Sequence, residues 1–297
     1  MDITVIGAPM DLGADRRGVD MGPSAIRYAD LTEKLSNQGH TVHDLGDIHI
    51  GGPETRAAGN PHLKYLEPIV ASARELAERT ERAVRAGSVP LVLGGDHSIS
   101  LGSIGGVASA KGTIGVIWFD AHGDFNTTDT TPSGNIHGMI LAALAGFGDP
   151  ALVNATGPGA RLNPAHIVIV GARALDAGER DLLHQARVRV LTMADIDRRG
   201  IYDVTTEAIA LATEGTNGLH VSFDMDVVDP SEVSGVGTAV HGGITYREAH
   251  SAMELVAASG RLVSMDLVEV NPILDQANRT AELATELALS ATGKRIF

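Results

Sequence analysis

Three short segments of the chain concentrate aspartate and histidine residues at spacings that could hold metal ions. In the first, Asp120, His122 and Asp124 alternate with one alanine and one glycine directly after a very apolar run. Side chains alternate faces along an extended chain, so residues two apart share one side. Two carboxylates side by side are costly after an apolar strand unless a cation neutralises them. We therefore expect these three side chains to converge on a metal ion.

Two further segments extend this set. Asp224 and Asp226 follow a second apolar run, and His97 follows the Gly-Gly-Asp turn that ends a third. Taken alone, His97 could equally cap the turn that the glycines allow. Together the segments supply four carboxylates and two imidazoles, and four negative charges balance about two divalent cations. Hard oxygen ligands suit Mn²⁺ better than Zn²⁺, although the order of affinities alone would favour zinc. We expect a site for two divalent cations, which would ionise a water molecule for a hydrolysis.

The loop after Asp124 carries polar residues that could bind a small substrate. The neutral side chains that could bind a carboxylate are Asn126, Thr131, Ser133 and Asn135. Ser133 or Asn135 could instead cap a helix that begins at Ile136. His137 could carry protons between the metal site and solvent, or it could be structural.

Two acidic residues that follow other strands also have competing interpretations. Glu269 lies between two valines, so its shielded carboxylate needs a partner. That partner could be a substrate guanidinium, which pairs with a carboxylate through two hydrogen bonds, or an internal arginine. Asp176 could cap the helix that follows it or bind a substrate ammonium group, and its spacing does not separate the two roles.

The elements that must position these residues alternate between strands and helices. The expected strands are Ile3–Ile6, Thr41–Leu45, Val89–Leu93, Ile114–Phe119, Ile167–Val170, Val188–Leu191, His220–Phe223 and Leu262–Leu267. The expected helices are Ser24–Leu35, Leu66–Ala86, Ile136–Ala145, Ala177–Ala186, Thr205–Ala212, Tyr246–Ala258 and Ala277–Ala291.

This alternation predicts an α/β fold in which helices cover both faces of a mostly parallel sheet. Ligands bind beyond the carboxyl ends of the strands in such sheets, which is where the candidate residues lie. No shift in composition marks a linker, so we expect residues 1–297 to form a single domain.

Composition limits the classes of partner and location. The formal charge of −14 argues against a general nucleic-acid or anionic-membrane binder. The absence of cysteine excludes disulfides and thiolate chemistry and fits a cytoplasmic protein. No apolar run approaches the roughly 20 residues of a membrane helix. The acidic, strand-like beginning leads us to expect no signal or transit peptide.

The motifs together resemble the ureohydrolase family, and within it the arginases of bacterial type. The resemblance covers essentially the whole chain. The segments that carry it are Gly7–Gly13, Arg16–Pro23, Gly94–Ser98, Asp120–Asp124, Ser133–Gly138, Ser222–Asp226, Gly242–Glu248 and Glu269–Pro272.

The resemblance implies a three-layer α/β/α fold, a dinuclear Mn²⁺ site and a homo-trimer or homo-hexamer. It also implies hydrolysis of L-arginine to L-ornithine and urea by a hydroxide that bridges the metal ions and attacks the guanidinium carbon. In the family pattern, one ion is bound by His97 and Asp124, the other by His122 and Asp226, and both by the bridging Asp120 and Asp224.

The resemblance implies roles for further residues. Asp124 would pass a proton to the departing amine, His137 would relay protons, and Glu269 would hold the guanidinium near Thr238. The α-carboxylate would be held by Asn126, Ser133 and Asn135, with Thr131 acting through water. The α-ammonium would be held by Asp176, with Glu179 assisting.

The chain departs from the family pattern at a few positions. Ala174 stands where many arginases carry an aspartate, and Val227-Val228, Ala239 and His241 replace commoner residues. These departures put affinity in question more than the type of reaction. The alternative is an amidinohydrolase that acts on another guanidine such as agmatine or guanidinobutyrate. The Ser133–Asn135 loop and Asp176 favour a substrate with both α groups.

Overall fold

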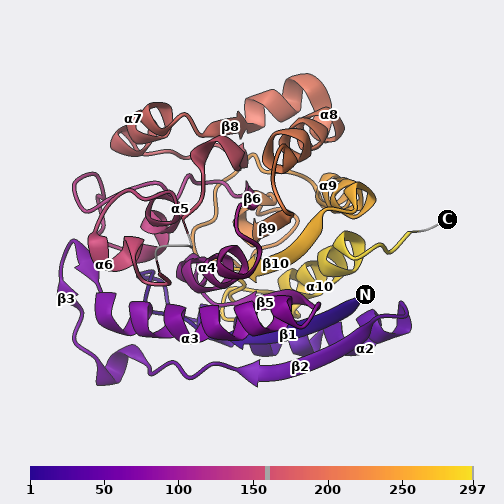
Figure 1. The fold of residues 1–297 in the computed structure, drawn as a ribbon, viewed down its shortest axis with the longest axis horizontal. Coiled ribbons are helices and arrows are strands. Elements are labelled where there is room, and N and C mark those ends of the chain that lie inside the picture. The colour runs from indigo at the N-terminus through magenta and orange to yellow at the C-terminus, as the bar shows by residue number, and fades with distance from the viewer. Residues whose placement is uncertain (158–160, 296–297) are drawn as a thin grey trace.

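Eight strands form a central sheet in the order β2-β1-β5-β10-β9-β6-β7-β8, and every neighbouring pair is parallel (Figure 1). The structure is a computed structural model and describes residues 1–157 and 161–295. The strands are β1 (Asp2–Ala8), β2 (Thr41–Asp47), β5 (Val89–Gly94), β6 (Gly115–Phe119), β7 (Ile167–Ala172), β8 (Arg189–Thr192), β9 (Leu219–Asp224) and β10 (Leu262–Val268). All eight strands that the sequence predicts are confirmed.

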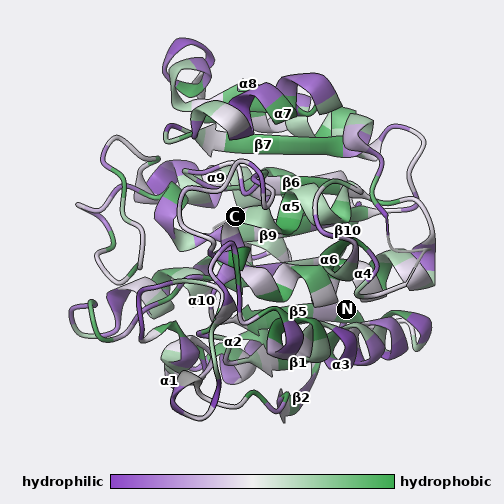
Figure 2. Cartoon of the chain, turned by 90° about the vertical axis from the view of Figure 1, so that its left-hand side faces the viewer, coloured by the Kyte–Doolittle hydropathy of each residue, from purple (hydrophilic) through white to green (hydrophobic). Residues whose placement is uncertain are grey.

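Helices cover both faces of this sheet and complete the expected three layers. One hydrophobic core includes residues of α1 (Gly22–Tyr28), α2 (Leu31–Asn37), α8 (Met193–Thr213), α9 (Tyr246–Ser259) and α10 (Arg279–Ala291). The core on the other face includes residues of α3 (Leu66–Arg85), α4 (Ser100–Lys111), α5 (Ile140–Leu144), α6 (Pro150–Val153) and α7 (Ala177–Ala186). Figure 2 shows hydrophobic strands between helices of mixed polarity. None of the described helices combines the length and apolarity that a membrane span requires.

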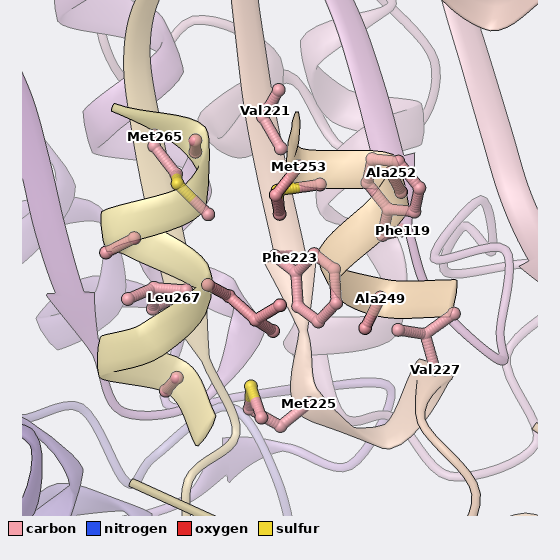
Figure 3. Packing of buried hydrophobic residues seen from close by; sticks show 14 of the residues in the cluster. Phe119, Val221, Phe223, Met225, Val227, Ala249, Ala252, Met253, Met265 and Leu267 are labelled. Carbon is pink, nitrogen blue, oxygen red and sulfur yellow. The ribbon is translucent and has the colours of Figure 1, made fainter. Parts of the chain in front are cut away.

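Successive strand residues belong to the two cores in turn, as a sheet covered on both faces requires. In β6, Ile117 and Phe119 belong to one core and Val116 and Trp118 to the other. Figure 3 shows Phe119 beside Phe223 of β9, with the α9 side chains packed over them. The two rings lie 5.3 Å apart between centroids. Burying one such side chain contributes about 1.5–3 kcal/mol, so these contacts hold the central strands firmly in place.

The order of the strands brings four carboxyl ends together at one edge. β10 lies between β5 and β9, and β6 lies on the other side of β9. The ends of β5, β6 and β9 carry the predicted metal-binding segments, and the end of β10 carries Glu269. The sequence predicts that these ends converge, but it does not reveal that β10 separates β5 from β9.

Several helices differ from their predicted bounds. The helix expected at Ser24–Leu35 is two helices, because Asp30 between them has a left-handed backbone conformation (φ 61°). The helix expected at Ile136–Ala145 begins as a 3₁₀ turn and continues as α5. The segment Thr205–Ala212 is the end of the longer α8, which is interrupted at Gly200. A small antiparallel hairpin of β3 (Gly59–Asn60) and β4 (Leu63–Lys64) was not expected.

Helix α4 is absent from the sequence prediction because its composition disfavours a helix. It contains Gly102, Gly105 and Gly106, and glycine is the worst helix former after proline. The packing explains these glycines. A Cβ atom on Gly106 would overlap the hydroxyl of Thr80 and the carbonyl of Ala77 in α3. The glycines therefore allow α4 to lie close against α3.

We predict that Gly106→Ala destabilises the protein by about 1–3 kcal/mol, because the added methyl overpacks the contact with α3. At an exposed helical position the same change stabilises by about 0.5–1 kcal/mol. The sign of the change in free energy of unfolding therefore distinguishes close packing from exposure. Urea denaturation at a fixed protein concentration measures it, with Ser109→Ala at a partly exposed position of α4 as the control. An unchanged or higher free energy of unfolding would contradict the close packing.

Candidate active site

The same local turn follows three of the strands that meet at this edge. In each turn an aspartate side chain accepts a hydrogen bond from the backbone N–H two residues later. The pairs are Asp96 with Ser98 (2.9 Å), Asp120 with His122 (2.6 Å) and Asp224 with Asp226 (2.7 Å). Such Asx turns bend the chain sharply as soon as the strand ends.

These turns replace the geometry that the sequence predicts for the aspartates. We expected residues 120–124 to converge because side chains two apart share one face of a strand. That reason is wrong, since β6 ends at Phe119 and β9 ends at Asp224. The side chains converge because of the Asx turns and because Asp124 has a left-handed conformation (φ 50°). The predicted residues are nevertheless brought together.

A first group of ligating atoms surrounds the ring of His97. Its Nδ1 lies 3.1 Å from Asp120 Oδ2, 3.1 Å from Asp124 Oδ2 and 3.2 Å from Asp224 Oδ2. All four side chains are buried. His97, Asp120 and Asp224 form one of the groups that could hold a metal ion.

A second group surrounds the ring of His122. Its Nδ1 lies 3.3 Å from Asp120 Oδ1 and 3.1 Å from Asp226 Oδ2, and these three residues form another potential metal group. Asp120 belongs to both groups, with one carboxylate oxygen toward each imidazole. A carboxylate in this position is able to bridge two cations.

The pKa shifts and the hydrogen bonding within the cluster indicate whether its donor atoms suit a cation. Burial raises the pKa of Asp224 well above its usual range, and the like charges of Asp226 and Asp120 raise it further. Burial, followed by the charge of Asp120, raises the pKa of Asp124 to about 6. His97 Nδ1 is buried without a hydrogen-bond partner. A divalent cation offsets these repulsions and uses that nitrogen, so the donor set fits metal ions.

Trp118 supports two of the candidate ligands, and the sequence analysis missed it. Its ring stacks on His97 with 3.9 Å between centroids and 5° between planes. Its Nε1–H donates to Asp120 Oδ2 over 2.9 Å. The signal was available in the sequence, because Trp118 precedes Asp120 by two residues.

A buried polar network reaches the other side of the His97 ring. Ser100 and Ser103 of α4 each donate to Asp266 Oδ2 over 2.7 Å. Ser222 lies 3.3 Å from Ser100 and 2.8 Å from His97 Nε2. The register of β9 and β10 pairs Asp266 with Ser222, so a stripe of polar residues crosses the two strands.

The direction of the hydrogen bonds in this network determines the tautomer of His97. Ser100 has one hydrogen and donates it to Asp266, so its oxygen accepts from Ser222. The oxygen of Ser222 is then free to accept from His97 Nε2–H. Nδ1 is left with the lone pair that a metal ligand needs. Asp266 thus orients His97 through two serines.

The predicted substrate-binding residues other than Glu269 line one pocket beside the cluster, with a volume of about 390 Å³. Its lining includes His122, Asp124, Asn126, Thr131, Ser133, Asn135, His137, Asp176, Glu179 and Thr238. Of the positions that depart from the family pattern, Ala174 is part of this lining. His241 is exposed at the surface.

Glu269 is buried and contacts two histidines, of which His137 lines the pocket. It has a left-handed conformation (φ 64°) and accepts from the backbone N–H of His97 over 3.0 Å. The same oxygen lies 3.1 Å from His137 Nδ1. Within the described residues its carboxylate pairs with no arginine, so the expected alternative of an internal arginine is wrong.

His137 is partly buried, contacts Glu269 and lines the pocket. Burial disfavours its protonated form, but the hydrogen bond and charge of Glu269 outweigh this and raise the pKa of His137 to about 9. The negative charges of Asp124 and Asp96 act in the same direction. His137 is therefore able to hold a proton near neutral pH.

The two acidic residues on the far side of the pocket have different surroundings. Asp176 is the N-cap residue of α7, and its Oδ2 accepts from Asn126 Nδ2 over 2.9 Å. Glu179 accepts from the backbone N–H groups of Phe125 (2.9 Å) and Asp176 (3.2 Å). Burial raises the pKa of Glu179 to about 7. Glu179 thus ties the metal-binding loop to α7.

Two further residues, Arg173 and Asp229, hold loops of the site. The sequence analysis did not connect either residue with the site. Arg173 donates to the backbone carbonyls of Asp226 (2.7 Å) and Val240 (2.6 Å). Asp229 accepts from the backbone N–H groups of Gly242 (2.7 Å) and Gly243 (3.0 Å). Both fix the loop that carries Thr238, whose hydroxyl donates to Asp226 over 2.9 Å.

Comparison with known proteins agrees with the site. The family model described as "Arginase family" matches residues 1–293. A curated arginase of Bacillus subtilis (strain 168) is 49% identical over 295 residues, which cover 99% of both chains. This chain belongs to the arginase family. The family is a family of hydrolases, and its members are metal-dependent.

Solved arginase-family structures share the whole fold. The native arginase structure from Bacillus caldovelox superposes with a TM-score of 0.96 at 48% identity and covers 99% of both chains. An arginase from Entamoeba histolytica, solved in complex with L-ornithine, has a TM-score of 0.88 at 31% identity and covers 98% of both chains. The resemblance to the arginases that the motifs indicate is confirmed.

We predict that Ser222→Ala weakens metal retention by about 10–100-fold, because His97 loses the acceptor that orients it. Metal content per chain after dialysis against buffered free Mn²⁺ measures the effect. Ser103→Ala is the matched control, since it removes a donor to Asp266 without breaking the path to His97. Equal metal content in Ser222→Ala and wild-type protein would show that the network does not orient the ligand.

Proposed function

We propose that this arginase-family chain hydrolyses L-arginine to L-ornithine and urea. The main support is the combination of full-length similarity to arginases with a His/Asp cluster that opens into a pocket of matching chemistry. The pocket lining combines the neutral side chains of one loop with the carboxylates of Asp124, Asp176 and Glu179. An amino acid that carries an α-carboxylate, an α-ammonium and a guanidinium matches this distribution.

We propose that the cluster holds two Mn²⁺ ions per subunit. His97 and Asp124 would bind one ion, His122 and Asp226 the other, while Asp120 and Asp224 would bind both. The carboxylate of Asp120, with one oxygen toward each imidazole, supports the shared role. Mn²⁺ ions at such a site lower the pKa of a bound water, so that hydroxide becomes available near neutral pH.

The guanidinium end of the substrate would lie deepest in the pocket. Glu269 would hold it there, because its carboxylate is buried and is held in place by the His97 N–H. Thr238 would contact the same group from the opposite loop. This arrangement orients the guanidinium carbon toward the cluster and excludes bulk water from it.

The amino-acid end would be recognised at the mouth of the pocket. Asn126, Ser133 and Asn135 would bind the α-carboxylate, with Thr131 acting through water. Asp176 would bind the α-ammonium with assistance from Glu179. The hydrogen bond between Asn126 and Asp176 supports this assignment, because it places a donor and an acceptor side by side for the two α groups.

Proton transfer would complete the reaction. Attack on the guanidinium carbon forms a carbon–oxygen bond, and the bond from that carbon to the Nε atom of the substrate then breaks. That nitrogen must gain a proton to leave as an amine. Asp124 would pass this proton, and His137 would exchange protons with solvent. The raised pKa of His137, near 9, supports a residue that is protonated at neutral pH.

Other expectations from the sequence stay predictions. Residues 1–297 would form a single ureohydrolase domain, for which the continuous eight-stranded sheet is the support. A homo-trimer or homo-hexamer is expected from the family resemblance. A cytoplasmic location and the absence of nucleic-acid and membrane partners are also expectations.

The decisive test measures urea from three guanidines after the protein is stripped with a chelator and reloaded with Mn²⁺. We expect urea from L-arginine and much less from agmatine and guanidinobutyrate, which each lack one α group. Stripped protein should be inactive and recover with Mn²⁺. Faster turnover of agmatine or guanidinobutyrate would instead support the alternative amidinohydrolase, and full activity without metal would exclude the proposed mechanism.

We further predict that Glu269→Gln lowers kcat/KM for L-arginine by at least about 100-fold, since an unpaired guanidinium charge is costly in a buried site. Metal content should not change, because glutamine keeps the oxygen that accepts from His97 N–H. Glu75→Gln on the surface of α3 is the matched control. Unchanged kinetics in Glu269→Gln would remove this residue from substrate binding.

A further inference from the structure

The unexpected β3–β4 hairpin packs directly on the loop that would bind the α-carboxylate. The backbone N–H of Lys64 donates to the carbonyl of Gly134 over 3.1 Å. Gly134 has a positive φ of 75°, and a Cβ atom there would overlap the carbonyl of Pro61. The close approach and the backbone conformation both require glycine. The backbones of the hairpin and the loop are therefore in direct contact.

The side chain of Lys64 makes a second link between the two segments. Its ammonium lies 3.0 Å from Asn135 Oδ1, and 2.9 Å and 3.2 Å from the two carboxylate oxygens of Asp15. The Lys64 side chain is three-quarters buried, while that of Asp15 is mostly exposed. Lys64 is not part of the pocket lining, but Asn135 is.

This contact determines which end of the Asn135 amide faces the pocket. An ammonium group has three donors and no acceptor, so only the amide oxygen can face Lys64. Lys64, followed by the Asn135 amide, lowers the pKa of Asp15, so one hydrogen of the NH₂ group lies toward Asp15 and the other is left for the pocket. Asn135 stands at the N-cap position of the following 3₁₀ turn, but its side chain makes no capping bond. The helix-cap role that the sequence allowed for Asn135 is therefore wrong.

The hydroxyl groups of Ser133 and Thr131 are likewise left to act as hydrogen-bond donors. Ser133 Oγ accepts from the backbone N–H of Asn135 over 3.2 Å, and Thr131 Oγ1 accepts from that of Gly134 over 2.9 Å. Their oxygens are engaged by the loop itself, which leaves their hydrogens to donate. With Asn135 fixed by Lys64, all three side chains offer donors, as an anionic carboxylate requires.

We propose that Lys64 is a positioning residue that gives this site its selectivity for a substrate α-carboxylate. It acts through Asn135, by fixing the amide so that its NH₂ group faces the pocket. Asp15 anchors the other side of the ammonium. The inference rests on the proposed function, because it assigns the recognition of one end of L-arginine.

The test compares variants of full-length, Mn²⁺-loaded protein with L-arginine as substrate. Lys64→Met keeps most of the aliphatic stem and removes the donor. We expect its KM to rise about tenfold, the size of a lost hydrogen bond to a charged group, while kcat stays within about twofold. Lys64→Arg should restore KM, since it keeps a donor. Lys34→Met is the matched control and should not raise KM, because the Lys34 ammonium contacts the backbone carbonyl of Ala29 and is not part of the pocket lining.

A double-mutant cycle separates positioning from general support of the hairpin. If Lys64 acts through Asn135, Lys64→Met has no further effect on KM in an Asn135→Ala background. Calorimetric titration with L-ornithine should show the same pattern in Kd. Equal effects of Lys64→Met in both backgrounds, or a KM within twofold of wild type, would overturn the inference. If wild-type protein releases no urea from L-arginine, the proposed function itself is wrong.

Discussion

Electrostatic repulsion among buried carboxylates is the constraint on which the site depends. Asp120, Asp124, Asp224 and Asp226 are nearly or fully buried within hydrogen-bond reach of only two imidazoles. Such a cluster is costly unless cations share its charge. Surrounding residues hold the cluster together despite that cost. Trp118 and Ser222 hold the rings and carboxylates, and Arg173 brings a positive charge to the adjacent loop.

The site is rigid because short backbone turns and left-handed residues recur where the strands end. Three Asx turns place side chains at the moment the strands end, and two non-glycine residues, Asp124 and Glu269, adopt left-handed conformations. Strained conformations of this kind persist only when surrounding contacts determine them. Here the carbonyl of Asp124 accepts from the backbone N–H of Leu141 in α5, and the N–H of Glu269 donates to the carbonyl of Gly95 after β5. The geometry is therefore fixed by the backbone of neighbouring elements.

Much of this organisation could be predicted from the sequence. Each of the eight strands follows from a run of β-branched and aliphatic residues, and the metal segments follow from aspartate and histidine at the strand ends. Other features depend on contacts distant in sequence. Helix α4 has a glycine-rich sequence that only its neighbour α3 explains, and the break at Asp30 overrides a helical pattern.

The candidate site also has features that the sequence predicts and features that it does not. Residue types and spacing predict which candidate ligands and pocket residues come together. The reason given for their convergence is wrong, because the strands end sooner than the pattern suggests. Asp266 and Lys64 lie far in sequence from the residues that they orient, so neither is visible as part of a motif. Their roles emerge only when β10 and the β3–β4 hairpin are placed in space.

The central position of β10 also determines how the molecule can be assembled. β5 pairs only with β1 and β10, and β9 pairs only with β10 and β6 among the described strands, so β10 joins two half-sheets. Five of the six candidate ligands belong to one half, and His97 belongs to the other. The two half-sheets can pair only after residues 262–268 have been synthesised. His97 therefore meets the other five candidate ligands late in folding.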